Sequence, residues 1–262
     1  MNSKNNSFEK HNRNLPPIVH EDEWLIAFDK PSGMLLAPDR RDHKRGCLVN
    51  LIHEAVSPEA FPAHRLDADT SGVILFAKNK SALKTIALLF ERREIQKLYL
   101  TLVHGAPPDP HMTVKENLIR DPARPGTMAI APKGGMKAET KLTIVKQWSR
   151  HSLLEISPLT SKTHQIRVHL VHVGCPIIAD NLYGSGTPLL LSEIKPNYNF
   201  SRERPETPLI GRLALHASSI SFKHPATGKA ITIEAPLPKD FKIAIKYLDK
   251  FSGTNFIQQT SN

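Results

Sequence analysis

Acidic, basic and hydroxyl side chains crowd into residues 64–72, directly before a short apolar run. Arg65 and Asp67 are two residues apart, so in an extended segment both side chains lie on one face. These residue types fit a polar loop that contains a surface ion pair and an Asx turn. The pattern from Asp67 onward also resembles the first half of a calcium-binding loop. Its twelfth position is Lys78 instead of a bidentate glutamate, so calcium is not favoured.

A second polar cluster occupies residues 160–169. Ser161 or Thr163 can cap a helix that starts here, which would leave the first backbone amides pointing at an anion. A phosphate or carboxylate partner fits this helix end, and so does a capped helix with a merely polar face. The basic and amide side chains gathered there are Lys162, His164, Gln165 and Arg167.

Metal and nucleotide signatures are weak in this chain. Zinc could use His169, His172 and Cys175, because histidines three residues apart on a helix can chelate a metal. However, the H-E-x-x-H pattern is absent and a fourth ligand would have to come from elsewhere. The sequence also lacks a P-loop, a G-x-G-x-x-G and a G-x-S-x-G motif. Nucleoside triphosphatase, dinucleotide-binding and hydrolase-elbow interpretations therefore lack support.

Lys97 and Tyr99 lie two residues apart on a predicted strand and should project from the same face. The tyrosine could belong to the core, or it could stack on a nucleobase.

The elements that must position these residues form an α+β mixture dominated by short strands. Strands are predicted at 72–77 and 98–103, in a hairpin at 18–29, in a pair at 141–157 turning at 149–150, and in a pair at 213–236 turning at 224–228. Helices are predicted at 48–56, at 81–93 with Ser81 as N-cap, and at 163–173 ending at Gly174. Residues 106–137 should be loop with short strands.

The distribution of these predicted elements sets the expected domain boundaries. We expect a disordered tail at 1–15, a single domain at 16–250 and a second tail at 251–262. Residues 185–212 contain four prolines, a density that favours a surface insertion.

Composition narrows the class of protein. Of the 262 residues, 40% are hydrophobic and 23% charged, which is typical of a globular protein. The net charge of +10 favours a polyanionic partner such as nucleic acid, an acidic protein or a membrane surface. No apolar run approaches the roughly 20 residues of a membrane span, and the first residues lack the apolar stretch of a signal peptide. Cys47 and Cys175 are too few for a disulfide framework. We expect a monomeric cytoplasmic protein with no membrane association.

Several segments together resemble the RluA-type pseudouridine synthase family. The resemblance extends over residues 18–241, and the segments occur in the family's order. Each segment alone is a weak signal, whereas several in order are specific. The segments are residues 29–34 (DKPSGM), 64–72 (HRLDADTSG), 97–99 (KLY), 163–169 (THQIRVH), 180–184 (DNLYG), 215–217 (LHA) and 224–225 (HP).

Two segments depart from the family pattern. The family usually has T-G-R-T-H-Q, but Ser161 and Lys162 occupy the second and third of these positions. Ala179 stands where the family usually has a glycine before Asp180. Lysine is a point charge without the planar fork of arginine, so a phosphate contact at position 162 should be weaker. These departures bear on substrate preference and leave the catalytic residues in place.

The resemblance implies a pseudouridine synthase fold, with a largely antiparallel mixed sheet flanked by a few helices and loops. The domain at 16–250 would be catalytic and would isomerise specific uridines in ribosomal or transfer RNA without a cofactor or metal. In this reaction the glycosidic bond breaks, the uracil rotates and its carbon 5 joins the sugar.

The resemblance also implies roles for individual residues. Asp67 is the catalytic carboxylate, as a nucleophile or as a base toward the sugar, and Arg167 is the cation paired with it. Tyr99 stacks under the uracil. The target base must leave its helix, with Arg65 holding the vacated stack and Leu215 packing beneath the base. The remaining residues expected along the RNA path are Lys97, Lys162, His164 and Gln165.

Three alternatives stay open at this point. A catalytically silent RNA-binding protein of the same fold would be consistent with the two departures. A metal-dependent RNA hydrolase could use Asp67, Asp69 and nearby histidines, and a chelator would inactivate it. A glycosidase-like hydrolase with paired carboxylates would release free uracil.

Overall fold

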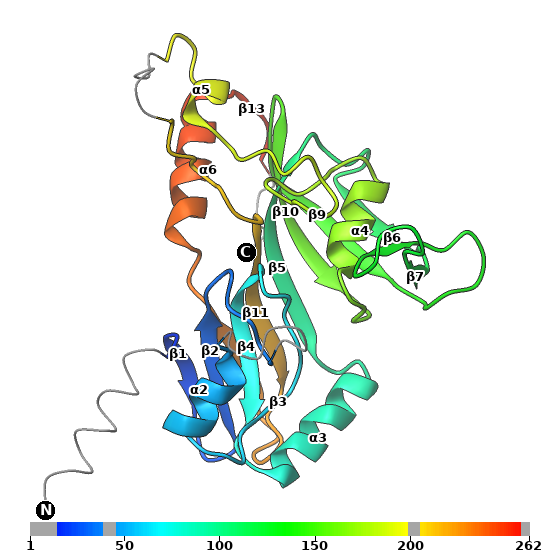
Figure 1. Cartoon of the computed structure of the whole chain (residues 1–262), viewed down its shortest axis with the longest axis vertical. Helices are drawn as coiled ribbons and strands as arrows, with labels where there is room; N and C mark the ends of the chain where they lie inside the picture. Colours follow the sequence, from blue (N-terminus) through cyan, green and yellow to red (C-terminus); the bar gives the residue numbers. More distant parts are fainter. Residues whose placement is uncertain (1–14, 39–45, 199–204, 258–262) are drawn as a thin grey trace, which may run out of the picture. The chain divides into compact units, whose positions relative to one another are not determined.

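A computed structural model describes residues 15–38, 46–198 and 205–257 (Figure 1). The chain divides into two compact units. Unit 1 contains the residues up to Lys97 together with Ala217–Pro236, and unit 2 contains Leu98–His216 together with the residues from Leu237 onward. Both units mix strands and helices, so the predicted α+β class is confirmed.

Unit 1 contains a sheet in which β1, β2, β4 and β11 are successive neighbours, with β3 paired to β4 and β12 paired to β11. The β1–β2, β2–β4 and β11–β12 pairs are antiparallel, which confirms the hairpin predicted at 18–29 and the strand pair predicted at 213–236. The strand bounds are β1 (Ile18–Glu21), β2 (Leu25–Lys30), β3 (Phe61–Pro62), β4 (Ser71–Ala77), β11 (Leu215–Lys223) and β12 (Ala230–Glu234).

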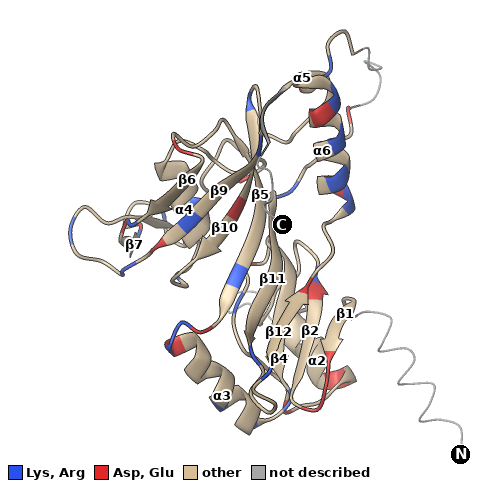
Figure 2. Ribbon diagram, turned by 180° about the vertical axis from the view of Figure 1, so that it is seen from behind, with Lys and Arg blue, Asp and Glu red and all other residues tan. Residues whose placement is uncertain are grey.

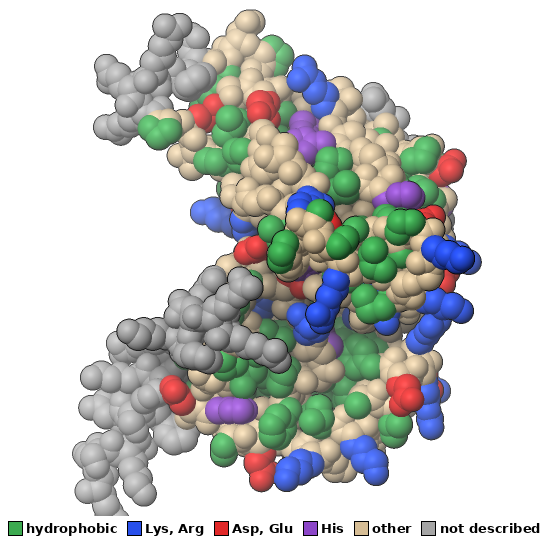
Figure 3. All heavy atoms as spheres, turned by 45° about the vertical axis from the view of Figure 1, so that its right-hand side comes forward, with side chains coloured by type: hydrophobic (Ala, Val, Ile, Leu, Met, Phe, Trp, Pro, Cys, Tyr) green, Lys and Arg blue, Asp and Glu red, His purple; other side chains and the backbone are tan. Residues whose placement is uncertain are grey.

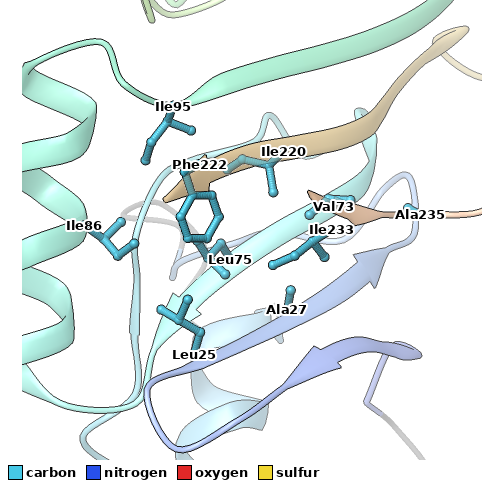
Figure 4. Close-up of a cluster of buried hydrophobic side chains, with 10 residues drawn as sticks. All are labelled: Leu25, Ala27, Val73, Leu75, Ile86, Ile95, Ile220, Phe222, Ile233 and Ala235. Atoms are coloured by element: carbon cyan, nitrogen blue, oxygen red, sulfur yellow. The ribbon is translucent and has the colours of Figure 1, made fainter. Parts of the chain in front are cut away.

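Alternating residues of these strands make the hydrophobic core of unit 1 (Figure 4). Because side chains alternate across a strand, one face of the sheet collects residues spaced by two. Ile86 of α3 (Lys80–Glu91) packs onto this face, and the helix α2 (Leu48–Ala55) buries Leu48 and Ile52. The cluster contains Leu25, Ala27, Val73, Leu75, Ile86, Ile95, Ile220, Phe222, Ile233 and Ala235.

The start of α3 differs from the prediction. Asn79, not Ser81, is the N-cap, and its side-chain oxygen accepts a hydrogen bond from the amide of Ala82 at 2.8 Å. Serine and asparagine are both strong caps, so residue type alone could not separate them.

Unit 2 contains a second set of antiparallel strands, in which β5 (Gln96–His104) continues from unit 1, β10 pairs with both β5 and β9, and β9 also pairs with β6 and β13. The predicted pair at 141–157 is thus confirmed. The bounds are β6 (His111–Val114), β9 (Thr140–Trp148), β10 (His151–Pro158) and β13 (Thr254–Ile257), with a separate hairpin of β7 (Leu118–Arg120) and β8 (Met128–Ile130).

Three helices complete unit 2: α4 (Gln165–His172), α5 (Leu191–Ile194) and α6 (Lys239–Phe251). Gly174 follows α4 with φ of +77°, as predicted for a glycine at a helix C-terminus. The predicted Ser161 or Thr163 cap is wrong. The N-cap of α4 is His164, which has φ of +53° and makes no side-chain capping bond.

Two expectations about the C-terminal part of the chain need correction. The segment 185–212 is not only a surface insertion, because Leu189 and Ile210 are fully buried and bridge each other, and α5 forms within it. The segment expected as a tail from residue 251 contains β13, which pairs with β9. The tail predicted at 1–15 falls almost entirely outside the described residues. Among the helices described, none has the length and apolar character needed to cross a membrane.

Asp22 joins two turns of unit 1. Its Oδ2 accepts hydrogen bonds from His20 Nε2 at 2.7 Å and His224 Nε2 at 3.0 Å, and its Oδ1 accepts from the amides of Trp24 and Leu25. Burial alone would raise the pKa of Asp22. The hydrogen bonds from His20 and the two amides, with the nearby charge of His224, hold it below its usual 3.8.

We predict that Asp22→Asn lowers the free energy of unfolding by about 1–2 kcal/mol near neutral pH, because two imidazole donors lose their shared acceptor. A pKa that is lower in the folded state stabilises the protein fully above the unfolded value of 3.8, and this contribution is lost as the pH falls below it. Urea unfolding at several pH values, with Asp109→Asn as an exposed control, measures the difference. A deficit that persists unchanged at acidic pH would contradict a role for the ionised carboxylate.

Candidate functional site

The residues predicted for the site are divided between the units. Arg65, Asp67 and Lys97 belong to unit 1, whereas unit 2 contains Tyr99, Lys162, His164, Gln165, Arg167 and Leu215. Each half is built by different local interactions.

In unit 1 the segment 64–72 leads into β4, in which all seven residues are buried. Arg65 is exposed, Leu66 is buried and Asp67 is half-buried. This alternation agrees with the predicted placement of Arg65 and Asp67 on one face. The amide of Thr70 donates to the carbonyl of Asp67 at 3.2 Å, which closes the turn after the aspartate.

A fully buried lysine braces this turn. Lys30 Nζ donates to the carbonyls of Ala68 at 2.8 Å, Met34 at 3.0 Å and Pro31 at 3.0 Å. The amide of Gly33 also donates to Ala68, and Ser32 Oγ donates to the carbonyl of Asp69 at 2.6 Å. A buried ammonium is costly unless its donors are satisfied, so these bonds fix the turn firmly. The DKPSGM segment therefore positions the loop that carries Asp67.

His64 has a structural position in this half. Its Nε2 accepts a hydrogen bond from the amide of Leu75 at 3.1 Å. Burial, helped by the charge of Lys97, lowers the pKa of His64 to about 3, so the ring is neutral at physiological pH. Lys97 is itself buried, and burial lowers its pKa to about 8. The RNA contact expected of Lys97 stays a prediction.

In unit 2 Arg167 is held by a bidentate ion pair. Its Nε donates to Asp180 Oδ2 at 2.8 Å and its Nη2 donates to Asp180 Oδ1 at 2.5 Å, and both side chains are almost completely buried. Burial alone would raise the pKa of Asp180. The hydrogen bonds and charge of Arg167, with the amides of Leu182 and Tyr183, hold it below its usual value. The carboxylate is therefore ionised and fixes the plane of the guanidinium.

Tyr183 supports Arg167 from a second direction. The guanidinium carbon lies 5.0 Å from the centre of the Tyr183 ring, a cation–π contact. The Tyr183 hydroxyl lies 2.7 Å from His164 Nδ1 and accepts a 2.7 Å hydrogen bond from the amide of Met128. His164, whose backbone is left-handed, thus holds the hydroxyl of the tyrosine that packs against the Arg167 guanidinium.

Gln165 uses all its hydrogen-bonding capacity within the protein. Its Oε1 accepts from the Thr160 hydroxyl and the Lys162 amide, and its Nε2 donates to the Glu139 carbonyl and to Thr140 Oγ1. The side chain is buried, so we propose a structural role for Gln165 in place of the predicted RNA contact.

Tyr99 and Leu215 are both buried, with 8% and 3% of their surface exposed. Lys97 and Tyr99 alternate with more exposed residues along β5, which confirms that they share a face of that strand. Tyr99 pairs with Ile156 of β10 in the sheet.

The zinc interpretation is not supported by the histidine contacts. His169 Nδ1 lies 2.9 Å from Thr140 Oγ1, and its Nε2 lies 2.9 Å from the Glu116 carbonyl, so both ring nitrogens are engaged. Burial raises the pKa of Cys175 to about 11, which disfavours the thiolate a metal would need. Within the described ranges, no three His, Cys, Asp or Glu side chains are grouped to hold a metal ion.

Sequence reasoning assigned no role to Lys30, Asp180 or Tyr183. All three lie in segments that carried the family resemblance, residues 29–34 and 180–184. The sequence signal that could have found them was the presence of a charged or aromatic residue, with no role yet assigned, inside one of these motifs. The contact partners of these residues lie elsewhere in the chain and cannot be predicted from sequence spacing.

Comparison with known protein families gives one clear match. The model of the RNA pseudouridylate synthase family matches residues 24–172, which is more than half of the chain and includes Asp67, Tyr99 and Arg167.

Individual relatives agree with this match. The chain is 37% identical over 234 residues to the ribosomal large subunit pseudouridine synthase C of Buchnera aphidicola subsp. Baizongia pistaciae, covering 88% of this chain and 70% of the relative. It is 35% identical over 246 residues to an uncharacterized RNA pseudouridine synthase of Chlorobaculum parvum, covering 87% and 73%. The solved structure of human RNA pseudouridylate synthase domain containing 1 superposes with a TM-score of 0.67 and 25% identity, covering 94% of this chain and 91% of the human chain.

We predict that Gly72→Ala destabilises the protein by about 3 kcal/mol or more. Gly72 ends the loop that carries Asp67, and neither its backbone conformation nor its surroundings admit a side chain. Gly72 has φ of +109°, and an added Cβ would clash with the carbonyl oxygen of Ala217. Gly46→Ala is the matched control, because a Cβ there meets no atom within 4 Å. Thermal unfolding of both variants measures the effect, and equal melting temperatures would contradict the proposed backbone constraint.

Proposed function

The chain belongs to the RNA pseudouridylate synthase family, and from that premise we propose that Asp67 is its catalytic carboxylate, assisted by Arg167 and Tyr99. The protein is an isomerase that converts uridine to pseudouridine within RNA. The bond between the sugar carbon 1′ and uracil nitrogen 1 breaks, and a bond from carbon 1′ to carbon 5 forms. Nitrogen 1 gains a proton and carbon 5 loses one, so no electrons are exchanged with another molecule.

Asp67 would act as a carboxylate, either by attacking the sugar or by removing a proton from it. Both roles need an ionised group in a site that the RNA shields from water. An ion pair with a guanidinium keeps such a group charged. We assign that guanidinium to Arg167.

The observation that carries this assignment is the buried guanidinium of Arg167. Taking a cation out of water costs several kcal/mol, and the Asp180 carboxylate offsets that cost while fixing the orientation of the group. A guanidinium has five N–H donors, so it can donate two hydrogen bonds to one carboxylate and still have donors for a second carboxylate. Tyr183 adds a stacking surface that limits its rotation.

Tyr99 is proposed to stack on the uracil and to help move the proton that carbon 5 loses. Its burial gives the ring a fixed orientation at low entropic cost. Leu215 is proposed to pack against the same base.

Arg65 is exposed and precedes the turn of Asp67, a position that suits the proposed filling of the stack when the target base flips out. Lys162 and His164 are half-buried and lie directly before α4, where they would contact the RNA backbone. The lysine would supply charge without the two-bond geometry of the arginine usual in the family.

Large-subunit ribosomal RNA is the proposed substrate, because the relatives from Buchnera and Pasteurella multocida bear the name ribosomal large subunit pseudouridine synthase C. Transfer RNA is the second candidate. We also propose that the protein is cytoplasmic and monomeric.

We predict that the wild-type protein releases tritium from unmodified ribosomal RNA labelled at carbon 5 of uridine, and does so in the presence of EDTA. Asp67→Asn should lower this rate by about 10³-fold or more, because the amide can neither attack nor accept a proton. Filter binding of the same RNA should change less than about threefold, since one side chain among many contacts is altered.

Several results would contradict the proposal. Release of free uracil would indicate a hydrolase, and loss of release in EDTA would indicate a metal-dependent enzyme. Absence of release by the wild type from both ribosomal and transfer RNA would favour the binding-only alternative.

A further inference from the structure

Unit 2 carries an ordered row of lysines on α6 that the proposed catalytic site does not use (Figure 2). The α6 lysine row consists of Lys239, Lys242, Lys246 and Lys250, and all four are exposed. With 3.6 residues per turn, the four side chains fall within an arc of about 80°. The buried residues of the helix, Phe241, Ala244 and Leu248, face the opposite way.

The acidic residues of α6 do not neutralise this row. Asp240 accepts hydrogen bonds from Arg212 Nε at 2.7 Å and Nη2 at 3.0 Å. Asp249 accepts from Lys146 Nζ at 2.8 Å and Trp148 Nε1 at 3.0 Å. Among the residues that the structure describes, no carboxylate forms an ion pair with a lysine of the row. The outward face of α6 is therefore an uncompensated stripe of positive charge.

The row ends at a hollow of about 570 Å³. Phe251 and Ser252, at the C-terminal end of α6, line it together with Arg150, His151, Lys195 and Tyr198. Lys195 Nζ lies 5.3 Å from the centre of the Tyr198 ring and 5.7 Å from that of Phe251, and Lys250 Nζ lies 5.2 Å from the Phe251 ring. Cations and aromatic rings are thus interleaved around the opening, and Glu193 is the acidic residue among those that line it.

One buried group in this hollow lacks a partner. His151 is 95% buried, and its Nδ1 forms no hydrogen bond with any described residue. Burial lowers the pKa of His151 to about 4, so the ring is neutral and its nitrogens can accept or donate according to tautomer. Its ring lies 5.4 Å from that of His104, so two neutral imidazoles pack together behind the wall of the hollow.

We propose that the α6 lysine row and this hollow form a second RNA-binding surface. The row binds successive phosphates of one RNA strand, and the hollow receives one unstacked nucleotide. Successive lysines rise by about 4.5 to 6 Å along the helix, a regular spacing suited to a linear polyanion. Aromatic rings beside lysines are the combination that holds single-stranded nucleic acid. The hollow has room for a single base and its sugar, and its polar lining offers hydrogen bonds to the base edge.

This surface is separate from the part of unit 2 that holds Arg167. Figures 1 and 2 show α6 and α4 well apart, with the strands β9 and β10 between them in both views. On the face that Figure 3 draws, lysine and arginine side chains are scattered among hydrophobic and acidic ones. The inference rests on the proposed function, because it takes RNA as the substrate.

The first test compares two triple variants that each remove three exposed positive charges. The row variant is Lys242→Gln, Lys246→Gln and Lys250→Gln, and the matched control on α3 and its C-cap is Lys80→Gln, Lys84→Gln and Arg92→Gln. The probe is unmodified, transcribed large-subunit ribosomal RNA, measured by filter binding over a series of KCl concentrations.

We expect the row variant to bind about tenfold more weakly and to lower the slope of log affinity against log salt by about 2, as for three lost phosphate contacts to a single strand. The control should change affinity by less than about twofold. The rate of pseudouridine formation at saturating RNA should be unchanged in the row variant. Equal weakening in both variants would show an effect of net charge only and would overturn the proposal.

The second test addresses the hollow. Tyr198→Ala should weaken binding of the RNA by about fivefold or more through lost base stacking. It should leave binding of heparin, a polyanion without bases, unchanged. Equal loss for RNA and heparin, or no loss for either, would overturn the placement of a nucleotide in the hollow.

The binding readout keeps the two proposals distinguishable. If the wild type forms no pseudouridine but the row variant loses RNA affinity, the proposed activity fails and the RNA-binding surface stands. If the wild type forms pseudouridine and the row variant binds normally, the surface alone fails.

Discussion

A guanidinium cannot be buried without a partner, and in this protein Arg167 meets that requirement through Asp180. The two-bond fork fixes the plane of the group, and the stacked Tyr183 ring limits its rotation. A buried ion pair adds little net stability compared with a hydrophobic pair of similar size. The pair instead fixes the orientation of the positive charge, which is what the proposed role of Arg167 in the reaction would need.

The same logic governs the half of the site in unit 1. Lys30 is buried and spends its three donors on backbone carbonyls around the turn that carries Asp67. Neither Lys30 nor Asp180 is proposed to touch the RNA. Each instead restrains a group for which a catalytic role is proposed, and in both cases the restraint comes from a buried charge that must be hydrogen-bonded. Two buried charges in separate units thus prepare Asp67 and Arg167 for one proposed reaction.

Much of this could be predicted from the sequence, for identifiable reasons. The helices α2, α3 and α4 and the main strand pairs follow hydrophobic periodicity, and the turns at Gly174 and at residues 224–228 follow local residue chemistry. The helices α5 and α6 were not predicted. The family resemblance supplied Asp67, Tyr99 and Arg167. The Arg167–Asp180 fork and the Lys30 bonds depend on contacts between separate segments, which spacing does not encode. The predictions of helix caps failed where two good candidates were close in sequence, as with Asn79 and Ser81. They also failed where a residue with a left-handed backbone precedes the helix, as with His164.

The central claim is that turnover depends on the fixed fork of Arg167 and not merely on its charge. The most direct measurement is the single-turnover rate of pseudouridine formation by Arg167→Lys at saturating RNA, using protein shown by circular dichroism to be folded. Lysine keeps the charge but cannot form the two parallel bonds to Asp180. We expect the rate to fall by at least about 100-fold while the RNA affinity stays nearly unchanged, as for a misplaced catalytic group. A rate within about threefold of the wild type would contradict it.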